Sequence, residues 1–258
     1  MAVDARHDPK HGREPAYAEF EPIHQLRAHE YVAEQIRRHI ALRLIKPGDP
    51  LQSERELAAM FGVGRPTVQH ALRLLEADRL VQARRGRHGG TFVCEPAEDD
   101  SAMEELMARV LRRRQEIEEA LAYRRALEPQ VTREAALMRR AGDVQRMAGA
   151  IDRMARASSE PEYMRCDTEF HLAVVGATRN RFMVGAIEDV RMRLGDVISL
   201  LPESDVWHRR LSGEHEAIAA AIELRDADGA ETAMETHVAA SEQSVRAVLT
   251  AIRRRLAP

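Results

Sequence analysis

Residues 47–81 read PGDPLQSERELAAMFGVGRPTVQHALRLLEADRLV, and this stretch decides the fold of the N-terminal part of the chain. Ser53 and Glu56 form the S-x-x-E capping box, which satisfies free N–H groups at the start of a helix. The GVG sequence (62–64) predicts a tight turn. Pro66 stands at or near the first position of the next helix, where proline is best tolerated. The stretch therefore predicts a capped helix, a turn and a second helix.

The segments on either side complete a winged helix-turn-helix. Apolar residues recur at helical spacing over 25–44 and predict one helix before the stretch. After it, VQARRGRHGGTFV (81–93) has two short strand-like runs around a glycine- and arginine-rich tip, the pattern of a β-hairpin. Three helices and a basic hairpin in this order predict a winged helix-turn-helix domain over residues 24–93, preceded by a flexible arm over residues 1–23.

The charge of the chain is divided unevenly. The 258 residues have a net charge of -3, yet residues 65–93 carry six arginines against two acids, and residues 141–258 carry fifteen arginines against nineteen acids. A basic N-terminal module attached to an acidic body is typical of a nucleic-acid-binding protein. No run of eighteen apolar residues is present, so we expect no membrane contact and a cytoplasmic protein. Two cysteines make no disulfide framework.

The rest of the chain is predicted to be an all-helical domain over residues 106–255, which makes the fold class mostly α. CEPAEDDSAMEE (94–105) is acidic and polar, and it is interpreted as a linker or as the frayed start of the next helix. Later breaks fall at turn-forming and capping residues. The expected helical segments are 104–140, 143–157, 160–177, 180–200, 204–225 and 227–255.

Side chains at the start of the second helix are the candidates for reading DNA. The second helix of a helix-turn-helix lies in the major groove with its N-terminal residues toward the base edges. Arg65 can pair with guanine there, and Thr67 can contact a phosphate or a thymine methyl group. The alternative is a solvated, arginine-rich surface on an ordinary helical hairpin. One turn further on lie Gln69 and His70, and the hairpin tip carries Arg84, Arg85 and Arg87.

Residues 47–81 resemble the DNA-binding domain of GntR-family bacterial transcription regulators, and the likeness covers nearly all of residues 26–93. This sequence departs from the family pattern, which usually has Ser in place of Gly64 and Arg-Glu in place of Gln69 and His70. Glutamine moves the expected base preference from guanine toward adenine. The resemblance implies DNA contacts by Arg55, Arg65, Thr67, Gln69, Arg85 and Gly86.

Residues 167–171 read DTEFH and place Asp167 and His171 on one face of a predicted helix. Such a pair alone is more often structural or solvated than a metal site. His215 in SGEHEAIAAAI and His237 in AMETHVAASE each border the apolar stripe of another predicted helix. If they converge, three imidazoles and one carboxylate form a competent site for Zn²⁺ or Ni²⁺. The alternative is a set of buried, hydrogen-bonded histidines.

The C-terminal part resembles the all-helical, antiparallel effector-binding bundle of the FadR/FCD branch of GntR regulators, over about residues 110–250. The stretches that carry the resemblance are LAYRRALEPQVTREAA, DTEFHLAVVGATRN, SGEHEAIAAAI and DADGAETAMETHV. It implies that Arg125 and Asn180 assist the binding of a small carboxylate effector; an internal salt bridge of Arg125 with Glu128 or a neighbouring helix is the alternative. The metal ligands that it implies are Asp167, His171, His215 and His237.

The resemblance implies a transcription regulator, most often a repressor, that responds to a small carboxylate metabolite. A homodimer is expected, because two winged helices match the symmetry of an inverted-repeat operator. A metal-dependent hydrolase with an appended DNA-binding domain is one alternative, although the sequence has no HExxH, nucleophile elbow or P-loop. An effector-independent DNA-binding protein is the other, and it leaves the acidic helical body without a role.

Overall fold

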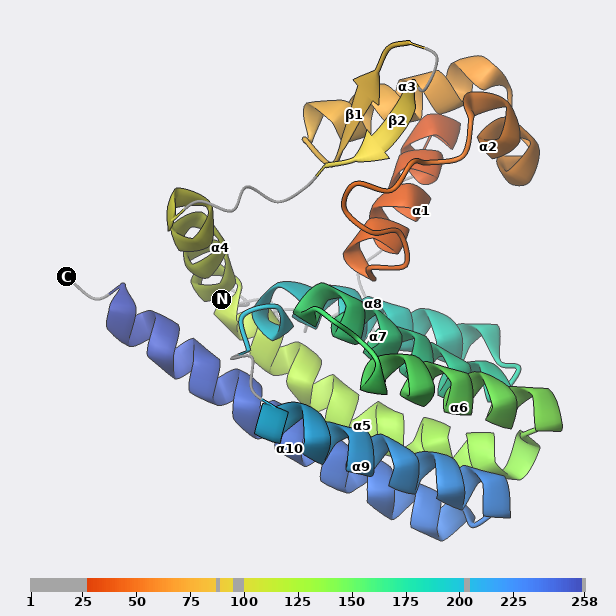
Figure 1. The fold of residues 1–258 in the computed structure, drawn as a ribbon, viewed down its shortest axis with the longest axis vertical. Coiled ribbons are helices and arrows are strands. Elements are labelled where there is room, and N and C mark those ends of the chain that lie inside the picture. The colour runs from red at the N-terminus through yellow and green to blue at the C-terminus, as the bar shows by residue number, and fades with distance from the viewer. Residues whose placement is uncertain (1–26, 87–88, 95–99, 202–204, 257–258) are drawn as a thin grey trace, which may run out of the picture.

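The structure is a computed structural model, and it describes residues 27–86, 89–94, 100–201 and 205–256. Figure 1 shows a small N-terminal part, made of helices and a two-stranded hairpin, above a larger bundle of helices. This arrangement confirms the mostly α fold class. The elements of the N-terminal part are α1 (Ala28–Ala41), α2 (Glu54–Phe61), α3 (Arg65–Ala77), β1 (Val81–Arg84) and β2 (Gly90–Val93).

The turn between α2 and α3 is set by local backbone chemistry. Ser53 Oγ accepts a hydrogen bond from the backbone N–H of Glu56 at 3.3 Å, and the Glu56 carboxylate accepts one from the backbone N–H of Ser53 at 2.9 Å. Helix α2 ends at Gly62 with a φ of 64°, in the left-handed region that favours glycine. Gly64 precedes α3, whose second residue is Pro66. The predicted capping box and turn are confirmed.

The hairpin that follows α3 is also confirmed. Strands β1 and β2 are antiparallel, with Val81 opposite Val93 and Arg84 opposite Gly90. The segment before α2 joins the same sheet edge, because the backbone N–H of Leu51 donates to the carbonyl of Thr91 at 2.8 Å. Buried side chains from α1, α2, α3 and both strands share one apolar core. The hairpin is therefore fixed to the helices by its base, where Val81 and Val93 enter the shared core.

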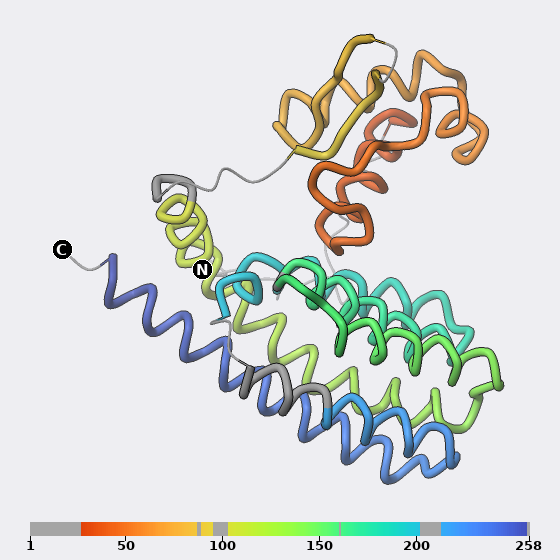
Figure 2. The backbone as a smooth tube through the Cα atoms, in the orientation of Figure 1, coloured from red at the N-terminus to blue at the C-terminus, as the bar shows by residue number. Residues whose placement is uncertain are grey.

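The C-terminal part is a helical bundle. Helix α5 packs against α10 and α8, α6 against α7, and α9 against α10. The two longest helices, α5 and α10, lie side by side along the bundle (Figure 2). In chain order the helices are α4 (Asp100–Arg112), α5 (Arg114–Met138), α6 (Ala141–Ala155), α7 (Glu160–Ala177), α8 (Arg181–Ile198), α9 (Asp205–Leu224) and α10 (Ala227–Arg255).

The structure differs from the sequence-based expectation at the start of the bundle. The helix expected over 104–140 is two helices, because the backbone leaves helical geometry at Arg113. Helix α4 begins at Asp100, so part of the 94–105 segment is helical. At the break, Arg113 ion-pairs with Glu116 of α5 and with Asp196 of α8. No proline or glycine marks this position, so the change of direction is set by tertiary contacts.

The bundle has a continuous apolar core that also positions the polar side chains described below. Phe170, Leu121, Ile218 and Met234 are among its fully buried members, and they come from α7, α5, α9 and α10. The inner faces of these four helices therefore meet in the middle of the bundle. None of the helices in the described ranges is long and apolar enough to cross a membrane.

Two glycines in open surroundings should respond to alanine substitution in opposite directions. A Cβ added at Gly62 or at Gly185 meets no atom within 4 Å, so packing contributes nothing to the effect of either substitution. Gly62→Ala forces a left-handed φ on an L side chain and should lower the free energy of unfolding by about 1–2 kcal/mol. Gly185→Ala, inside α8, should raise it by roughly 0.5–1 kcal/mol. Urea unfolding followed by circular dichroism measures both; equal signs would contradict the assignment.

Candidate functional site

The four residues predicted to bind a metal lie together inside the bundle. Helix α7 supplies Asp167 and His171, α9 supplies His215, and α10 supplies His237. One ligating atom from each residue lies within 4.8 Å of the other three, and all four residues are buried. The spacing of four residues along α7 brings its two side chains to one face, and tertiary packing brings the other two to meet them.

The distances inside this cluster match those between ligands of one ion. His215 Nε2 lies 3.1 Å from Asp167 Oδ1, and His171 Nε2 lies 3.8 Å from the same oxygen. The ring centroid of His237 is 4.7 Å from that of His215 and 5.1 Å from that of His171. Two ligands at tetrahedral angles about one Zn²⁺ are about 3.4 Å apart. Small side-chain rotations therefore suffice to close this set around an ion.

Hydrogen bonding supports the fit of an ion to these residues. Both ring nitrogens of His215 and Nε2 of His171 are buried, and within the described part of the chain none of them has a hydrogen-bond partner of good geometry. Buried polar atoms in folded proteins nearly always have a partner. Imidazole nitrogens directed at a shared point beside a carboxylate have the chemistry of a transition-metal site.

Carboxylates behind two of the histidines hold their rings in a ligating orientation. Nδ1 of His237 hydrogen-bonds the Glu214 carboxylate at 3.1 Å. Nδ1 of His171 lies 3.3 Å from Oε2 of Glu128, whose side chain is also buried. When Nδ1 of a neutral imidazole carries the proton toward a carboxylate, Nε2 is left free to bind a metal. Both histidines are therefore oriented with Nε2 toward the cluster.

Burial sets the protonation states of the cluster. It lowers the pKa of His171 from 6.5 to about 3, and the positive charge of Arg191 acts in the same direction. Burial likewise lowers the pKa of His237. Burial alone would raise the pKa of Asp167, but the charge of Arg191, together with the His215 hydrogen bond and the charges of both histidines, holds that pKa well below its usual range. At neutral pH these side chains are in the forms that bind metal ions.

Arg191 is a site residue that the sequence reasoning missed. It lies on α8, is 7% exposed, and donates hydrogen bonds to Oδ2 of Asp167 and, at 3.0 Å, to Oγ1 of Thr168. Asp167 thus offers Oδ1 to the histidines and Oδ2 to the arginine. Nothing in the sequence marks Arg191 for this role, because it stands among other arginines on an amphipathic helix.

Arg124 replaces Arg125 as the arginine on the cluster side of α5. Arg124 is 3% exposed, and it donates to Glu128 at 2.9 Å and to Ser241 of α10 at 2.8 Å. Burial would raise the pKa of Glu128, but the charge of Arg124, together with the contacts of His171 and the charge of Arg191, keeps that pKa below its usual value. Arg125 instead points outward and binds the Glu242 carboxylate through both oxygens, at 2.7 and 2.9 Å. The salt-bridge alternative to an effector contact is the one observed for Arg125.

Helical geometry explains why Arg124 faces the cluster and Arg125 faces outward. Successive residues of an α-helix point about 100° apart. Only one of two adjacent arginines can face the bundle interior, and the i,i+4 pairing of Arg124 with Glu128 selects it. Asn180 also has a different place from the one expected: its side-chain oxygen caps α8 by accepting from the N–H groups of Phe182 and Met183, at 3.0 and 3.4 Å.

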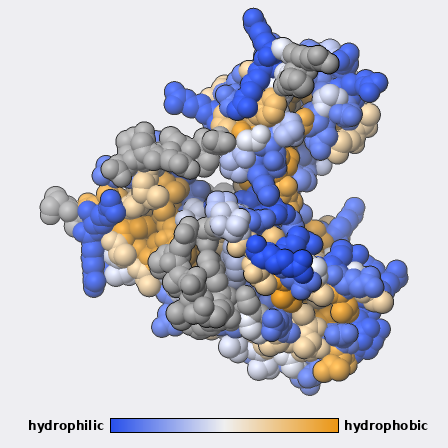
Figure 3. Space-filling view, in the orientation of Figure 1, coloured by the Kyte–Doolittle hydropathy of each residue, from blue (hydrophilic) through white to orange (hydrophobic). Residues whose placement is uncertain are grey.

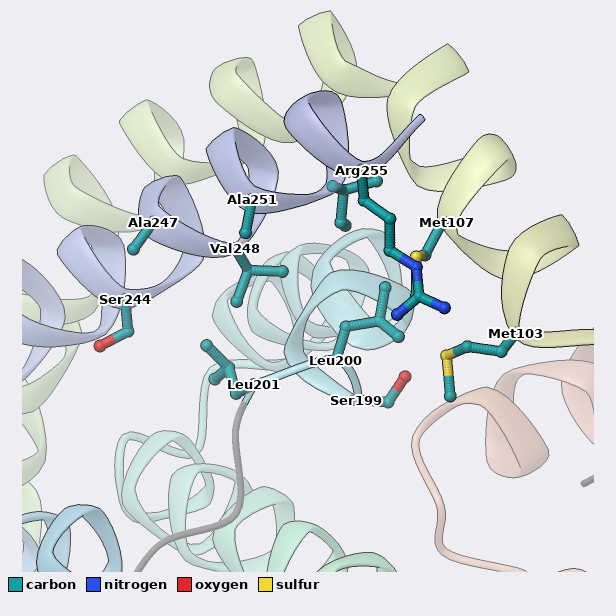
Figure 4. Close-up of a pocket in the computed structure, with 11 residues that line it drawn as sticks. Met103, Met107, Ser199, Leu200, Leu201, Ser244, Ala247, Val248, Ala251 and Arg255 are labelled. Carbon is teal, nitrogen blue, oxygen red and sulfur yellow. The ribbon is translucent and has the colours of Figure 1, made fainter. Parts of the chain in front are cut away.

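A separate pocket of about 620 Å³ lies at the other end of the bundle, between α4, the end of α8 and α10 (Figure 4). Figure 3 shows apolar surface beside α4 on this side of the molecule. None of the four cluster residues lines the pocket. Its lining is mostly apolar, with Met107, Leu201 and Val248 among its members, so it lacks the nitrogen and carboxylate donors found in the cluster.

Most of the candidate DNA-contacting residues are exposed on the N-terminal domain. Arg55, Arg65 and Gln69 are exposed on α2 and α3, and Thr67 is half-buried. Arg85 and Gly86 are exposed after β1, at the hairpin tip, and Arg87 lies outside the described residues. Arg84 stacks over the Phe92 ring at 4.5 Å, so its guanidinium is held against the hairpin.

Two α3 side chains have partners within the domain. Nε2 of Gln69 donates to the Glu54 carboxylate at 2.8 Å, which engages one of the two amide N–H groups available for an adenine contact. The His70 ring stacks on His29 of α1, with centroids 3.8 Å apart and an angle of 9° between the planes. The sequence suggested neither contact, because both partners lie on other helices.

Comparison with known proteins identifies the family. The gntR family of bacterial regulatory proteins matches residues 28–93, and the FCD domain matches residues 119–240. The HTH-type transcriptional regulator LutR of Bacillus subtilis is 31% identical over 207 residues, which are 75% of this chain and 90% of LutR. The chain belongs to the GntR family. It is a GntR regulator of the FCD type, and these families are transcription regulators rather than enzymes.

Two further GntR-type relatives align over most of the chain. The HTH-type transcriptional repressor NanR of Cronobacter sakazakii is 29% identical over 222 residues, covering 84% of this chain and 85% of NanR. The Uxu operon transcriptional regulator of Escherichia coli is 30% identical over 220 residues, covering 82% of this chain and 84% of that regulator. Both alignments extend through the DNA-binding domain into the helical bundle, so the two-part architecture is shared.

The buried histidine cluster makes the stability of the metal-free protein depend on pH. Between pH 6.5 and about 3 the unfolded chain protonates His171 and the folded chain does not. The unfolded state then binds more protons, so the free energy of unfolding must fall as the pH is lowered. From pH 7.5 to 5.5 the share of His171 in this loss is on the order of 1 kcal/mol. Urea unfolding in EDTA at both pH values measures the fall in the free energy of unfolding. In His171→Gln this fall should be smaller than in the wild-type protein by the share of His171. An equal fall in both proteins would refute the prediction.

Proposed function

We propose that this GntR regulator binds operator DNA with an affinity controlled by a small carboxylate effector, which binds at a divalent metal ion in the bundle. The observation that carries the proposal is the buried set of four ligating atoms within 4.8 Å of one another. The ion would be held by the set predicted from the sequence. Zn²⁺ or Ni²⁺ fits three imidazoles and one carboxylate best.

The residues around the cluster suit an anionic ligand. Arg124 and Arg191 are buried beside it, and each already binds a protein carboxylate. A guanidinium presents a planar set of donors that can grip a carboxylate in two bonds. When bound, the metal would supply open coordination positions for an effector oxygen. Because Arg124 is the buried arginine of the pair on α5, we assign it the effector-binding role in place of Arg125.

On the DNA side, we propose a homodimer that reads an inverted repeat in the cytoplasm. Two winged helix-turn-helix domains related by two-fold symmetry match such an operator. Within each domain the proposed contacts are made by the N-terminal end of α3 and by the hairpin tip. Repression is the proposed outcome, supported by the name of NanR, a repressor that aligns along 84% of this chain.

The two alternative functions fit less well. A metal-dependent hydrolase disagrees with membership of a family of transcription regulators. An effector-independent DNA-binding protein does not explain the buried cluster. Burial of charged and imidazole side chains costs free energy, and such a protein has no ligand at the cluster to offset that cost. The elaborate polar interior is best explained by ligand binding.

Elemental analysis tests the metal site. Purified, untagged protein, dialysed without chelator, should contain about one Zn or Ni per chain, because four ligands are in place. His215→Ala removes a ligand from the centre of the cluster and should lose the metal. His39→Ala, on the surface of α1, is the matched control and should retain it. Absence of metal from the wild-type protein after addition of Zn²⁺ and Ni²⁺ would overturn the proposed site.

Arg65→Ala tests the recognition helix. An operator fragment can be selected from a random DNA pool with the wild-type protein, and fluorescence anisotropy then measures its binding. Loss of a bidentate arginine–guanine contact should weaken operator binding by about 1–3 kcal/mol and reduce discrimination against random DNA. Arg114→Ala removes the same charge at the start of α5 and should have no such effect. Unchanged discrimination in Arg65→Ala would reject the assignment.

A further inference from the structure

Helix α1 of the DNA-binding domain reaches the bundle at its C-terminal end, where it lies against α8 (Figure 1). The Arg38 guanidinium lies 3.4 Å from the Glu188 carboxylate and makes a second, shorter ion pair with Asp189. Two turns further along α8, a Cβ on Gly195 would lie 3.6 Å from the carbonyl oxygen of Ala41. The end of α1 is thus held by charge at one point of α8 and lies in close contact with it at another.

The same stretch of α8 also contacts the histidine cluster, through Asp167. Arg191 follows Glu188 by three residues, a rise of about 4.5 Å along the helix axis. Its guanidinium binds the Asp167 carboxylate inside the bundle, whereas Glu188 and Asp189 bind Arg38 outside it. Less than one helical turn therefore separates the cluster contact from the contact with the DNA-binding domain. A helix of 18 residues moves as a rigid body over so short a distance.

Helix α7, which carries Asp167, faces the DNA-binding domain as well. Hydrogen bonds from Ser158 are the main cause of the lowered pKa of Glu162, in the first turn of α7, and the positive charge of Lys46 contributes to it. Lys46 lies in the segment that connects α1 to α2. The first turn of α7 therefore lies within range of the charge of Lys46.

We propose that α8 couples the histidine cluster to the DNA-binding domain. On its inner side α8 contacts the cluster through Arg191, and on its outer side Glu188 and Asp189 form ion pairs with Arg38. This inference rests on the proposed function, because it needs a ligand at the cluster. Asp167 shares its carboxylate between Arg191 and the ligand position. A cation at the cluster, or an anion that engages Arg191, changes the attraction that holds α8 to α7.

The consequence for DNA binding follows from the shared helix. A shift of α8 carries Glu188 and Asp189 with it and changes their pairing with Arg38. The placement of α1, and of the recognition helix packed on it, then depends on the state of the cluster. Such a coupling is reciprocal, so DNA binding must alter the affinity for the ligand by the same factor.

Hydrogen–deuterium exchange of the full-length, metal-free protein, with and without Zn²⁺ alone, tests the coupling. In the wild-type protein Zn²⁺ should slow exchange in α7 and change it by about fivefold or more in the last two turns of α1, the lower end of typical couplings. In Arg38→Ala the response of α7 should remain and that of α1 should disappear. Arg37→Ala is the matched control, because Arg37 pairs with Glu34 and Asp78 inside the DNA-binding domain; it should retain both responses.

The outcomes separate the coupling from the metal site. A response in α7 without one in wild-type α1 would overturn the coupling and leave the proposed metal site intact. A response of α1 that survives in Arg38→Ala would overturn the route through α8. No response in α7 would remove the metal site, and the coupling with it. Restoration of the α1 response in the double variant Arg38→Glu, Asp189→Arg would assign the effect to the ion pair.

Discussion

The burial of the Asp167 carboxylate is the constraint on which the bundle interior depends. A carboxylate far from water is stable only with compensating charge and hydrogen bonds. Arg191 provides the charge on one side, and the imidazoles of His171 and His215 lie on the other. Helices α7 and α8 therefore pack closely at this point, and α9 directs its His215 side chain toward the same carboxylate. Their apolar residues then pack around a polar centre whose position is already fixed.

A second layer of charge surrounds the first. Glu128 lies behind His171 and is in turn neutralised by Arg124, while Glu214 hydrogen-bonds His237. Each buried charge in this network has an opposite charge or a hydrogen-bond donor beside it, as a low-dielectric interior requires. The helical bundle is in this respect unlike the DNA-binding domain, whose core is apolar and whose charges lie on the surface. The interior of the bundle thus combines apolar packing with a buried charge network, whereas the core of the DNA-binding domain is stabilised by apolar packing alone.

Local features of the fold could be read from the sequence, because their causes are local. The Ser53 capping box, the left-handed Gly62 and the hairpin each depend on a few neighbouring residues. The four cluster residues were also found, although their convergence followed only from a family resemblance. Features that depend on tertiary packing were missed. The break at Arg113 is decided by neighbouring helices, and Arg124 rather than Arg125 faces the interior because it pairs with Glu128 of α5 and with Ser241 of α10.

The hydrogen bond from Gln69 to Glu54 has a consequence for how operator preference can change between related regulators. With one amide N–H held by Glu54 of α2, Gln69 has its carbonyl oxygen and its second N–H left for contacts outside the domain. In the proposed docking, this oxygen selects base edges that donate. Residue 54 then shapes base preference without touching a base. Drift at such a supporting position, outside the recognition helix, offers a route by which duplicated regulators could acquire separate operators while their base-contacting residues stay the same.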